Sequence, residues 1–388
     1  MNESISYGKQ NVSEDDIQEV VKVLRSDWLT QGPAIERFEK QVAAYCGARY
    51  AVAVSSATAG LHIACLAAEL KPGDLLWTSA NTFAASANCG RYCGSDVDFV
   101  DIDPLTANLS LADLTKKLDQ ASAQDRLPKI LVPVHFAGQS CDMRAIAELA
   151  KKYKITVIED ASHALGGTYQ GHRIGGGQYS DMTILSFHPV KMITTGEGGM
   201  VLTNQKDLYD RLVRLRTHGI TRDPNQLRFP SSGAWYYEQI ELGFNYRLTD
   251  IQAALGISQL KRLDDFVKCR AEISDYYREK LASLPLKMLD RTPQANSSNH
   301  LFVVRLVLNR ISKTHAQVFD ELRALGIGVN LHYIPVYLHP YYRQLGFGPG
   351  HCVESEKYAA EALSLPIHTN LTAEDLHRVY RALQKVLQ

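Results

Sequence analysis

One lysine, Lys191, occupies an unusual place in the stretch SFHPVKMITTGEGGMVLTN, which runs from residue 186 to 204. An apolar β-type run (MTILSF) precedes it, and a glycine-rich turn and a second β-type run (GMVLTN) follow it. Pro189 rules out a continuing helix, and the glycines let the backbone turn sharply and approach a ligand. A lysine held at the ligand edge of a sheet can form a Schiff base with a carbonyl compound. The alternative is an ordinary solvated lysine, which is what most lysines are.

An aspartate, Asp160, stands two residues after the apolar run ITVI in the segment ITVIEDASHALG, with Glu159 between them. A carboxylate at the end of an apolar strand is costly to bury unless a cation or a hydrogen-bond donor meets it. A pyridinium nitrogen is one suitable partner, because an ionised aspartate keeps that nitrogen protonated. The alternative is that Glu159 or Asp160 caps the following turn. His163 could face the same ring, or it could be a hydrogen-bonded core histidine.

Small residues with free amides form a third candidate group, SSATAGLH at residues 55–62, which follows an apolar run and opens a helical pattern. Amides at a helix N-terminus attract anions, although an ordinary N-cap would look the same. Ser186 could add a hydroxyl to the same anion. Phe83 ends another run, where its ring could stack on a flat ligand or pack in the core. Together, a lysine, an aspartate, an anion-binding turn and an aromatic ring are what pyridoxal phosphate needs.

Seven short apolar runs between about residues 48 and 204 have to position these side chains. The runs are ARYAVAVSS, DLLWTSANTF, DVDFVDID, KILVPVHFAG, ITVIEDAS, MTILSFH and GMVLTN, and amphipathic segments such as CDMRAIAELAKKY separate several of them. Strands that alternate with helices indicate βαβ units, and therefore an α/β fold with a mainly parallel sheet covered on both faces. Ligands of such sheets lie beyond the carboxyl ends of the strands.

The pattern changes after Leu248. The stretch from residue 248 to 284 predicts one long helix with Thr249 as its N-cap. A polar linker (291–299), a β-type run (HLFVVRLVL), a helical stretch (THAQVFDELRALG) and an amphipathic tail follow. We therefore predict two units, a large domain over residues 1–246 and a small α+β domain over residues 247–388.

Composition excludes several classes of function. The 388 residues include 42 Lys+Arg and 42 Asp+Glu, so no net charge favours nucleic acid or a membrane surface. No apolar run approaches the roughly 20 residues of a membrane span, and the first ten residues lack a signal-peptide pattern. The 7 cysteines are scattered, and no second Cys/His pair at zinc spacing accompanies Cys89 and Cys93. We expect no metal, reduced thiols, a cytoplasmic location and a small-molecule ligand.

The sequence also resembles a known family of proteins. Blocks along nearly the whole chain resemble the nucleotide-sugar aminotransferases of the DegT/DnrJ/StrS type, which are pyridoxal-phosphate enzymes with the type I (aspartate-aminotransferase) fold. The blocks are YGKQNVSEDDIQEV, WLTQGPAIERFE, SSATAGLH, EDASHALG, SFHPVKMITTGEGGMVLTN, RTHGI, GFNYRLTDIQAALGISQL, HYIPVYLHPYY and LSLPIHTNLT. The resemblance implies a large sheet domain that binds pyridoxal phosphate and a smaller C-terminal domain.

The resemblance also implies roles for individual residues. Lys191 matches the lysine that binds the cofactor and moves the proton, and Asp160 matches the carboxylate at the pyridine nitrogen. His163 matches a position, often Gln, near the phenolic oxygen. The remaining cofactor positions are Ala57, Thr58 and Ser186 at the phosphate, Phe83 stacked on the ring, and Asn245, which reaches the phosphate in the neighbouring subunit. A homodimer with shared active sites follows from the last of these.

Substrate contacts follow from the same matching, with the alternative that these are ordinary aromatic and loop residues. The positions are Tyr7, Trp28, Leu29, Thr30, Arg247, His332 and Tyr333. Within the family, SFHPVKMITTGEGG, SHALGGTYQ and NLHYIPVY are most similar to the branch that serves pseudaminic-acid biosynthesis. That branch uses glutamate to aminate a UDP-linked 4-keto-6-deoxy-N-acetyl-altrosamine. Met192 departs from the proline expected after the lysine.

Three rival functions stay open at this stage. One is amination of a different nucleotide-linked keto-sugar. A sugar dehydratase of the same fold is another, but the dehydratases that resemble this family have histidine where Lys191 stands. The third is a non-catalytic sensor of pyridoxal phosphate or a sugar nucleotide, and no helix-turn-helix segment or basic arm precedes residue 12.

Overall fold

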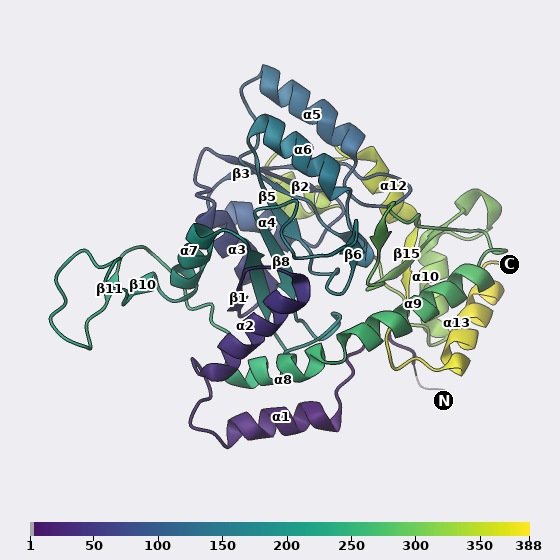
Figure 1. The fold of residues 1–388 in the computed structure, drawn as a ribbon. Coiled ribbons are helices and arrows are strands. Elements are labelled where there is room, and N and C mark those ends of the chain that lie inside the picture. The colour runs from purple at the N-terminus through teal and green to yellow at the C-terminus, as the bar shows by residue number, and fades with distance from the viewer. Residues whose placement is uncertain (1–3) are drawn as a thin grey trace.

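A seven-stranded sheet forms the centre of the computed structural model, which describes residues 4–388 (Figure 1). Each strand falls inside one of the seven predicted runs. In sheet order the strands are β1 (Tyr50–Val54), β9 (Gly199–Thr203), β8 (Met182–Ser186), β5 (Thr156–Asp160), β4 (Ile130–Val132), β2 (Leu75–Ser79) and β3 (Asp96–Val100). All neighbours from β8 to β3 are parallel, and only β9 runs antiparallel to the strands beside it. The mainly parallel sheet is therefore confirmed.

Helices cover both faces of this sheet, as predicted. One face packs against α3 (Ala57–Ala67), α4 (Ala85–Tyr92) and α7 (Lys206–Arg216). The other face packs against α2 (Pro33–Cys46), α5 (Leu111–Ala123), α6 (Met143–Tyr153) and α8 (Asp250–Leu260).

Strand side chains alternate between the two faces. Ile158 and Ile184 belong to the apolar cluster around α3 and α4. Asp160 and Ser186 stand two residues further along the same strands, so they face the same side at the carboxyl ends of β5 and β8. Both polar residues therefore lie near the N-termini of α3 and α4.

A second, smaller unit follows. Its sheet has the order β12 (Leu286–Met288), β14 (Phe302–Leu306) and β15 (Ala362–Leu365), and both pairs are antiparallel. Three helices share its apolar cluster, namely α9 (Leu263–Lys280), α10 (His315–Ala324) and α13 (Ala373–Val386). The predicted strand, helical stretch and amphipathic tail are thus all present.

The single long helix predicted after Leu248 is wrong. Two helices, α8 and α9, are separated at Lys261 and Arg262. Arg262 leaves the helical conformation (φ −105°, ψ 3°) and donates hydrogen bonds to Asp16 Oδ2 (2.5 Å) and Asn11 Oδ1 (2.9 Å). The break thus coincides with a tertiary contact to the N-terminal segment, about which the helical periodicity carries no information. The N-cap was predicted correctly, since the Thr249 hydroxyl accepts from the Gln252 amide in a capping box.

The packing of α8 indicates where the boundary between the large and the small domain lies. Ala253 and Ile257 of α8 lie in the apolar cluster of the large sheet with Phe38 and Phe187. We therefore propose that the small domain begins with α9, one helix later than the predicted boundary at residue 246. Ile5 joins the small domain from the other end of the chain through a bridge with Ile327.

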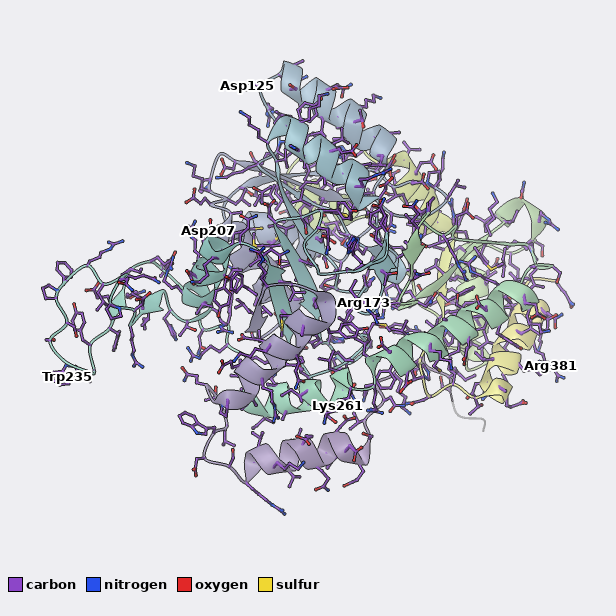
Figure 2. The ribbon with its side chains drawn as sticks, in the orientation of Figure 1. Asp125, Arg173, Asp207, Trp235, Lys261 and Arg381 are labelled. Atoms are coloured by element: carbon purple, nitrogen blue, oxygen red, sulfur yellow. The ribbon has the colours of Figure 1, made fainter. Side chains whose placement is uncertain are left out.

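The remaining elements are short or peripheral. They are α1 (Glu14–Leu24), β6 (Thr168–Tyr169), β7 (His172–Arg173), β10 (Ile220–Thr221), β11 (Glu238–Gln239), β13 (Ala295–Asn296), α11 (Pro340–Arg343), α12 (Val353–Glu361) and 3-10 turns at Phe136–Gly138, Leu308–Arg310 and Val336–Leu338. The segment that carries β10 and β11 projects away from the body (Figure 1), with Trp235 at its far end (Figure 2). No helix within residues 4–388 is long and apolar enough to cross a membrane.

Candidate active site

A cavity of about 990 Å³ opens at the carboxyl ends of the central strands. Its walls come from both domains, because the turn before α3, the loop after β8 and the segment 330–334 all line it. The sequence-predicted residues that it brings together are Tyr7, Ala57, Thr58, Phe83, Asp160, His163, Ser186, Lys191, His332 and Tyr333. A volume of this size accommodates a cofactor together with a substrate.

Lys191 lies in the loop that joins β8 to β9, and its amide donates to the His188 carbonyl (2.9 Å). Burial lowers the pKa of the Lys191 amine to about 8, although the nearby Asp160 charge acts in the opposite direction. An amine with this pKa is partly neutral near physiological pH, so it can act as a nucleophile and as a base.

The glycines after Lys191 bring the chain back against the anion-binding turn. A Cβ atom on Gly199, the first residue of β9, would lie 2.5 Å from the Ala57 nitrogen. Only glycine therefore lets β9 pass this close to the N-terminus of α3.

Asp160 is 5% exposed at the end of β5. Its Oδ2 accepts a hydrogen bond from the Ser86 hydroxyl (2.6 Å) and its Oδ1 accepts one from the Ser162 amide (3.1 Å). Both partners are neutral, which leaves a buried carboxylate at the cavity wall that fits a cationic ring nitrogen. Glu159 points to the other face of the sheet, where its Oε2 lies 2.6 Å from His135 Nε2.

Histidines and tyrosines surround Lys191. The Tyr333 hydroxyl lies 3.2 Å from His163 Nε2, and the rings of His163 and His300 are 4.4 Å apart. Burial and the Lys191 charge hold the pKa of His163 well below its ordinary range and lower that of His332 to about 4. These imidazoles are therefore neutral near pH 7. His300 was not predicted, because it is only the first residue of a β-type run and belongs to no motif.

The turn before α3 has the free donors that an anion needs. Ser56 caps the helix by accepting from the Ala59 amide (3.1 Å). The amides of Ala57 and Thr58, at the first two helical positions, have no hydrogen-bond partner among residues 4–388. Ser186 lines the cavity beside them. These unpaired donors fit a phosphate group.

Phe83 is 61% exposed, so core packing, the alternative raised from the sequence, is wrong. Its ring lines the cavity with a centroid 6.3 Å from that of Tyr333. An exposed aromatic ring beside Asp160 and the anion-binding turn fits a flat cofactor.

Five predicted residues lie outside the cavity wall of this chain: Trp28, Leu29, Thr30, Asn245 and Arg247. Thr30 forms a bridge with Thr249, and Arg247 forms one with Val54, next to the anion-binding turn. Asn245, Trp28 and Leu29 are exposed. Their positions are open to a second subunit.

A covered α/β sheet with a lysine in the loop after a strand, a buried strand-end carboxylate and free amides at a helix N-terminus fits a pyridoxal-phosphate enzyme of fold type I. The chain matches the DegT/DnrJ/EryC1/StrS aminotransferase family over residues 10–384, and it belongs to that family.

Two relatives are similar to this chain over nearly their whole length. The chain is 36% identical over 388 residues to a UDP-4-amino-4,6-dideoxy-N-acetyl-beta-L-altrosamine transaminase of Campylobacter jejuni, covering 99% of this chain and 98% of the relative. It is 37% identical over 372 residues to the GDP-perosamine synthase of Caulobacter vibrioides, covering 95% and 94%.

Solved structures agree with this assignment. The aminotransferase PseC of Helicobacter pylori, involved in the biosynthesis of pseudoaminic acid, superposes with a TM-score of 0.90 at 28% identity, covering 99% of both chains. The pyridoxal-phosphate form of a putative sugar aminotransferase of Streptococcus pneumoniae gives a TM-score of 0.88 at 28% identity, covering 99% of this chain and 100% of that one.

These comparisons confirm the type I fold, the family and pyridoxal phosphate as the cofactor. The protein is an aminotransferase, so the non-catalytic sensor considered from the sequence was wrong.

Proposed function

We propose that this aminotransferase moves the amino group of L-glutamate to C4 of a UDP-linked 4-keto-6-deoxy-N-acetyl-hexose, as in pseudaminic-acid biosynthesis. The observation that carries the proposal is a cavity that places Lys191, Asp160 and a phosphate-binding turn together, in a chain similar over its full length to an altrosamine transaminase.

We assign the cofactor positions as follows. Asp160 holds the pyridine nitrogen, His163 lies near the phenolic oxygen, and Phe83 stacks on the ring. Ala57, Thr58 and Ser186 hold the phosphate. Bound pyridoxal phosphate supplies a ring that accepts the electron pair left when a substrate carbon loses its proton.

Lys191 moves the proton in this proposal. Its Nζ, with a pKa of about 8, would take the proton from the α-carbon of glutamate when the amine is neutral and pass it to the bound cofactor, and in the second half of the cycle it would carry a proton from the cofactor to C4 of the sugar. 2-Oxoglutarate leaves after the first half, and the keto-sugar then receives the amino group.

Sugar recognition falls to the side of the cavity formed by the segment 330–334 and Tyr7. The rings of Tyr7 and His332 lie 5.3 Å apart, and His332 Nδ1 lies 2.8 Å from the Ser364 hydroxyl. A neutral, anchored imidazole can exchange hydrogen bonds with sugar hydroxyl or carbonyl oxygens without adding charge. Tyr333 offers its hydroxyl from the same wall.

We further propose a homodimer with shared active sites. Large apolar side chains are exposed on and beside the projecting segment, including Phe229 (68%), Trp235 (75%) and Leu242 (79%). A set of exposed, large apolar side chains is typical of a protein–protein interface. Asn245 follows directly, so the same contact would bring it to the phosphate in the partner subunit, with Trp28, Leu29, Thr30 and Arg247 near the sugar.

A cytoplasmic location is part of the proposal. All seven cysteines are free thiols, which fits a reducing compartment.

A panel of substrates tests the sugar assignment. The purified protein is incubated with glutamate and with UDP-, dTDP- and GDP-linked 4-keto-6-deoxy sugars, and the amino-sugar products are identified by mass and NMR. We expect the UDP-linked N-acetyl sugar to give the highest kcat/KM. Preference for the GDP-linked sugar would instead support the second candidate, which the 37% identity to a GDP-perosamine synthase favours.

A further inference from the structure

A buried chain of two hydroxyl groups ends on Asp160. Thr82 Oγ1 lies 2.8 Å from Ser86 Oγ, and Ser86 Oγ lies 2.6 Å from Asp160 Oδ2. The exposed fractions of the three side chains are 2%, 0% and 5%. None of the motifs in the sequence singles out Thr82 or Ser86.

The direction of these hydrogen bonds follows from the chemistry of their ends. An ionised carboxylate only accepts, so the Ser86 hydroxyl must donate its single proton to Asp160. Ser86 Oγ then remains free to accept, and the Thr82 hydroxyl donates to it. The chain therefore runs from Thr82 through Ser86 to the carboxylate, and each bond polarises the next one.

Two neighbouring elements hold the chain in place. Thr82 lies in the loop after β2, which also carries Phe83, and Ser86 lies in the first turn of α4. The Ser86 amide donates to the Phe83 carbonyl (3.2 Å), and the Ser86 carbonyl accepts from the Cys89 thiol (3.2 Å). The main chain of Ser86 is thus held in place on both sides, which fixes the point from which its hydroxyl reaches Asp160.

Asp160 is held at both of its oxygens. Ser86 meets Oδ2, and the Ser162 amide meets Oδ1 at 3.1 Å. Two donors on different oxygens define the plane of the carboxylate, whereas the amide alone would leave that plane free to rotate. A bond to a charged acceptor, made in a buried place, is also among the stronger ones.

We propose that Ser86, supported by Thr82, is a positioning residue that orients the Asp160 carboxylate toward the pyridine nitrogen of the cofactor. The inference rests on the proposed role of Asp160. Ser86 acts through Asp160 and touches neither substrate.

The test compares Ser86→Ala, Thr82→Val and the double variant. For Ser86→Ala we expect kcat to fall about tenfold or more with KM for glutamate little changed, since one hydrogen bond to a charged group is lost. The dissociation constant for pyridoxal phosphate, measured on the apoprotein by tryptophan fluorescence, rises by a similar factor. Thr82→Val gives a smaller effect of the same kind, and Ser86→Thr, which keeps the hydroxyl, restores most of the loss.

The double variant provides the sharpest outcome. Thr82 also lines the cavity, so the double variant tests whether it acts through Ser86: the proposal predicts that the double variant behaves as Ser86→Ala alone, and additive losses would overturn the chain. Thr78→Val is the matched control, since Thr78 is also a fully buried hydroxyl (0% exposed) but donates to the Val132 carbonyl. If Thr78→Val lost as much kcat and cofactor affinity as Ser86→Ala, the effect of Ser86→Ala would be general destabilisation of the protein and not a loss of positioning.

Asp160→Ala separates this inference from the proposed function. If Asp160→Ala stays active, the assigned role of Asp160 fails and the inference fails with it. If Asp160→Ala is inactive while Ser86→Ala matches the unmodified protein in kcat and cofactor affinity, only the positioning role is overturned.

Discussion

At the residue scale, the environment of Lys191 changes an ordinary side chain into a reactive one. Burial lowers its pKa to about 8 even though the Asp160 charge opposes that change. Compared with a solvated lysine, about two-hundredfold more of the amine is neutral at pH 7. The neutral imidazoles of His163 and His332 add no competing positive charge near it.

This pKa gives a pH dependence with a definite sign. The rate at which the apoprotein captures pyridoxal phosphate should rise with pH and reach half its maximum near pH 8, because only the neutral Lys191 amine attacks the aldehyde. Stopped-flow absorbance measures this rate. Asp160→Asn should move the midpoint to lower pH, since the Asp160 charge raises the pKa of Lys191. A midpoint near pH 10 would contradict the account.

Single residues differ in how far the sequence identifies them. Lys191 and Asp160 could be predicted because Asp160 ends an apolar segment that becomes β5, and Lys191 lies in a short stretch between two apolar runs that become β8 and β9. Phe83 stayed ambiguous, because its exposure depends on how the loop after β2 lies over the cavity. Ser86 and His300 could not be found, since each reaches the site only through packing between segments far apart in the chain.

At the scale of secondary-structure elements, β9 runs very close to the N-terminus of α3. This close approach shapes the anion-binding turn. A side chain at Gly199 would meet the backbone of both Ala57 and Ser56, at 2.5 and 2.6 Å. Backbone atoms cannot move aside as the end of a flexible side chain can.

Gly199→Ala should therefore displace the turn and raise the dissociation constant for pyridoxal phosphate about tenfold or more, with a lower melting temperature. Gly348→Ala is the control, because a Cβ atom there meets nothing within 4 Å. Both quantities can be followed by fluorescence. Unchanged cofactor affinity in Gly199→Ala would show that the turn does not hold the phosphate.

The positions of the central strands were predicted better than the direction of β9 or the break between α8 and α9. All seven central strands could be located from their apolar runs, but no pattern in the run GMVLTN shows that β9 is antiparallel. The strand turns back because no helix lies between it and β8. The break between α8 and α9 coincides with the contacts of Arg262 to Asp16 and Asn11, which the sequence pattern does not show.

At the scale of the whole molecule, the single chain leaves part of the proposed site open. Asn245, Trp28 and Leu29 are exposed and outside the cavity, and the segment with Trp235 projects from the body (Figure 2). The proposed homodimer with shared sites would account for all of these positions. Composition and periodicity carry no information about such a contact, so only the family resemblance pointed to it.

Shared sites predict complementation between two inactive variants. Lys191→Ala removes the amine, and Asn245→Asp places a carboxylate against the phosphate held by the partner subunit. In a hybrid dimer isolated with two different tags, one of the two sites contains both intact residues. We expect the hybrid to recover about half of the normal activity, whereas each parent dimer stays inactive. An inactive hybrid would contradict sites shared through Asn245.

The most direct measurement of the central claim is a single half-reaction with glutamate, comparing the unmodified protein with Lys191→Ala. Lys151→Ala, on the exposed surface of α6, serves as the control. We predict that the unmodified protein and the control each release one 2-oxoglutarate per active site and lose the absorbance of the lysine-bound cofactor. Lys191→Ala should show neither that absorbance nor any 2-oxoglutarate. A coloured, active Lys191→Ala protein would contradict the account.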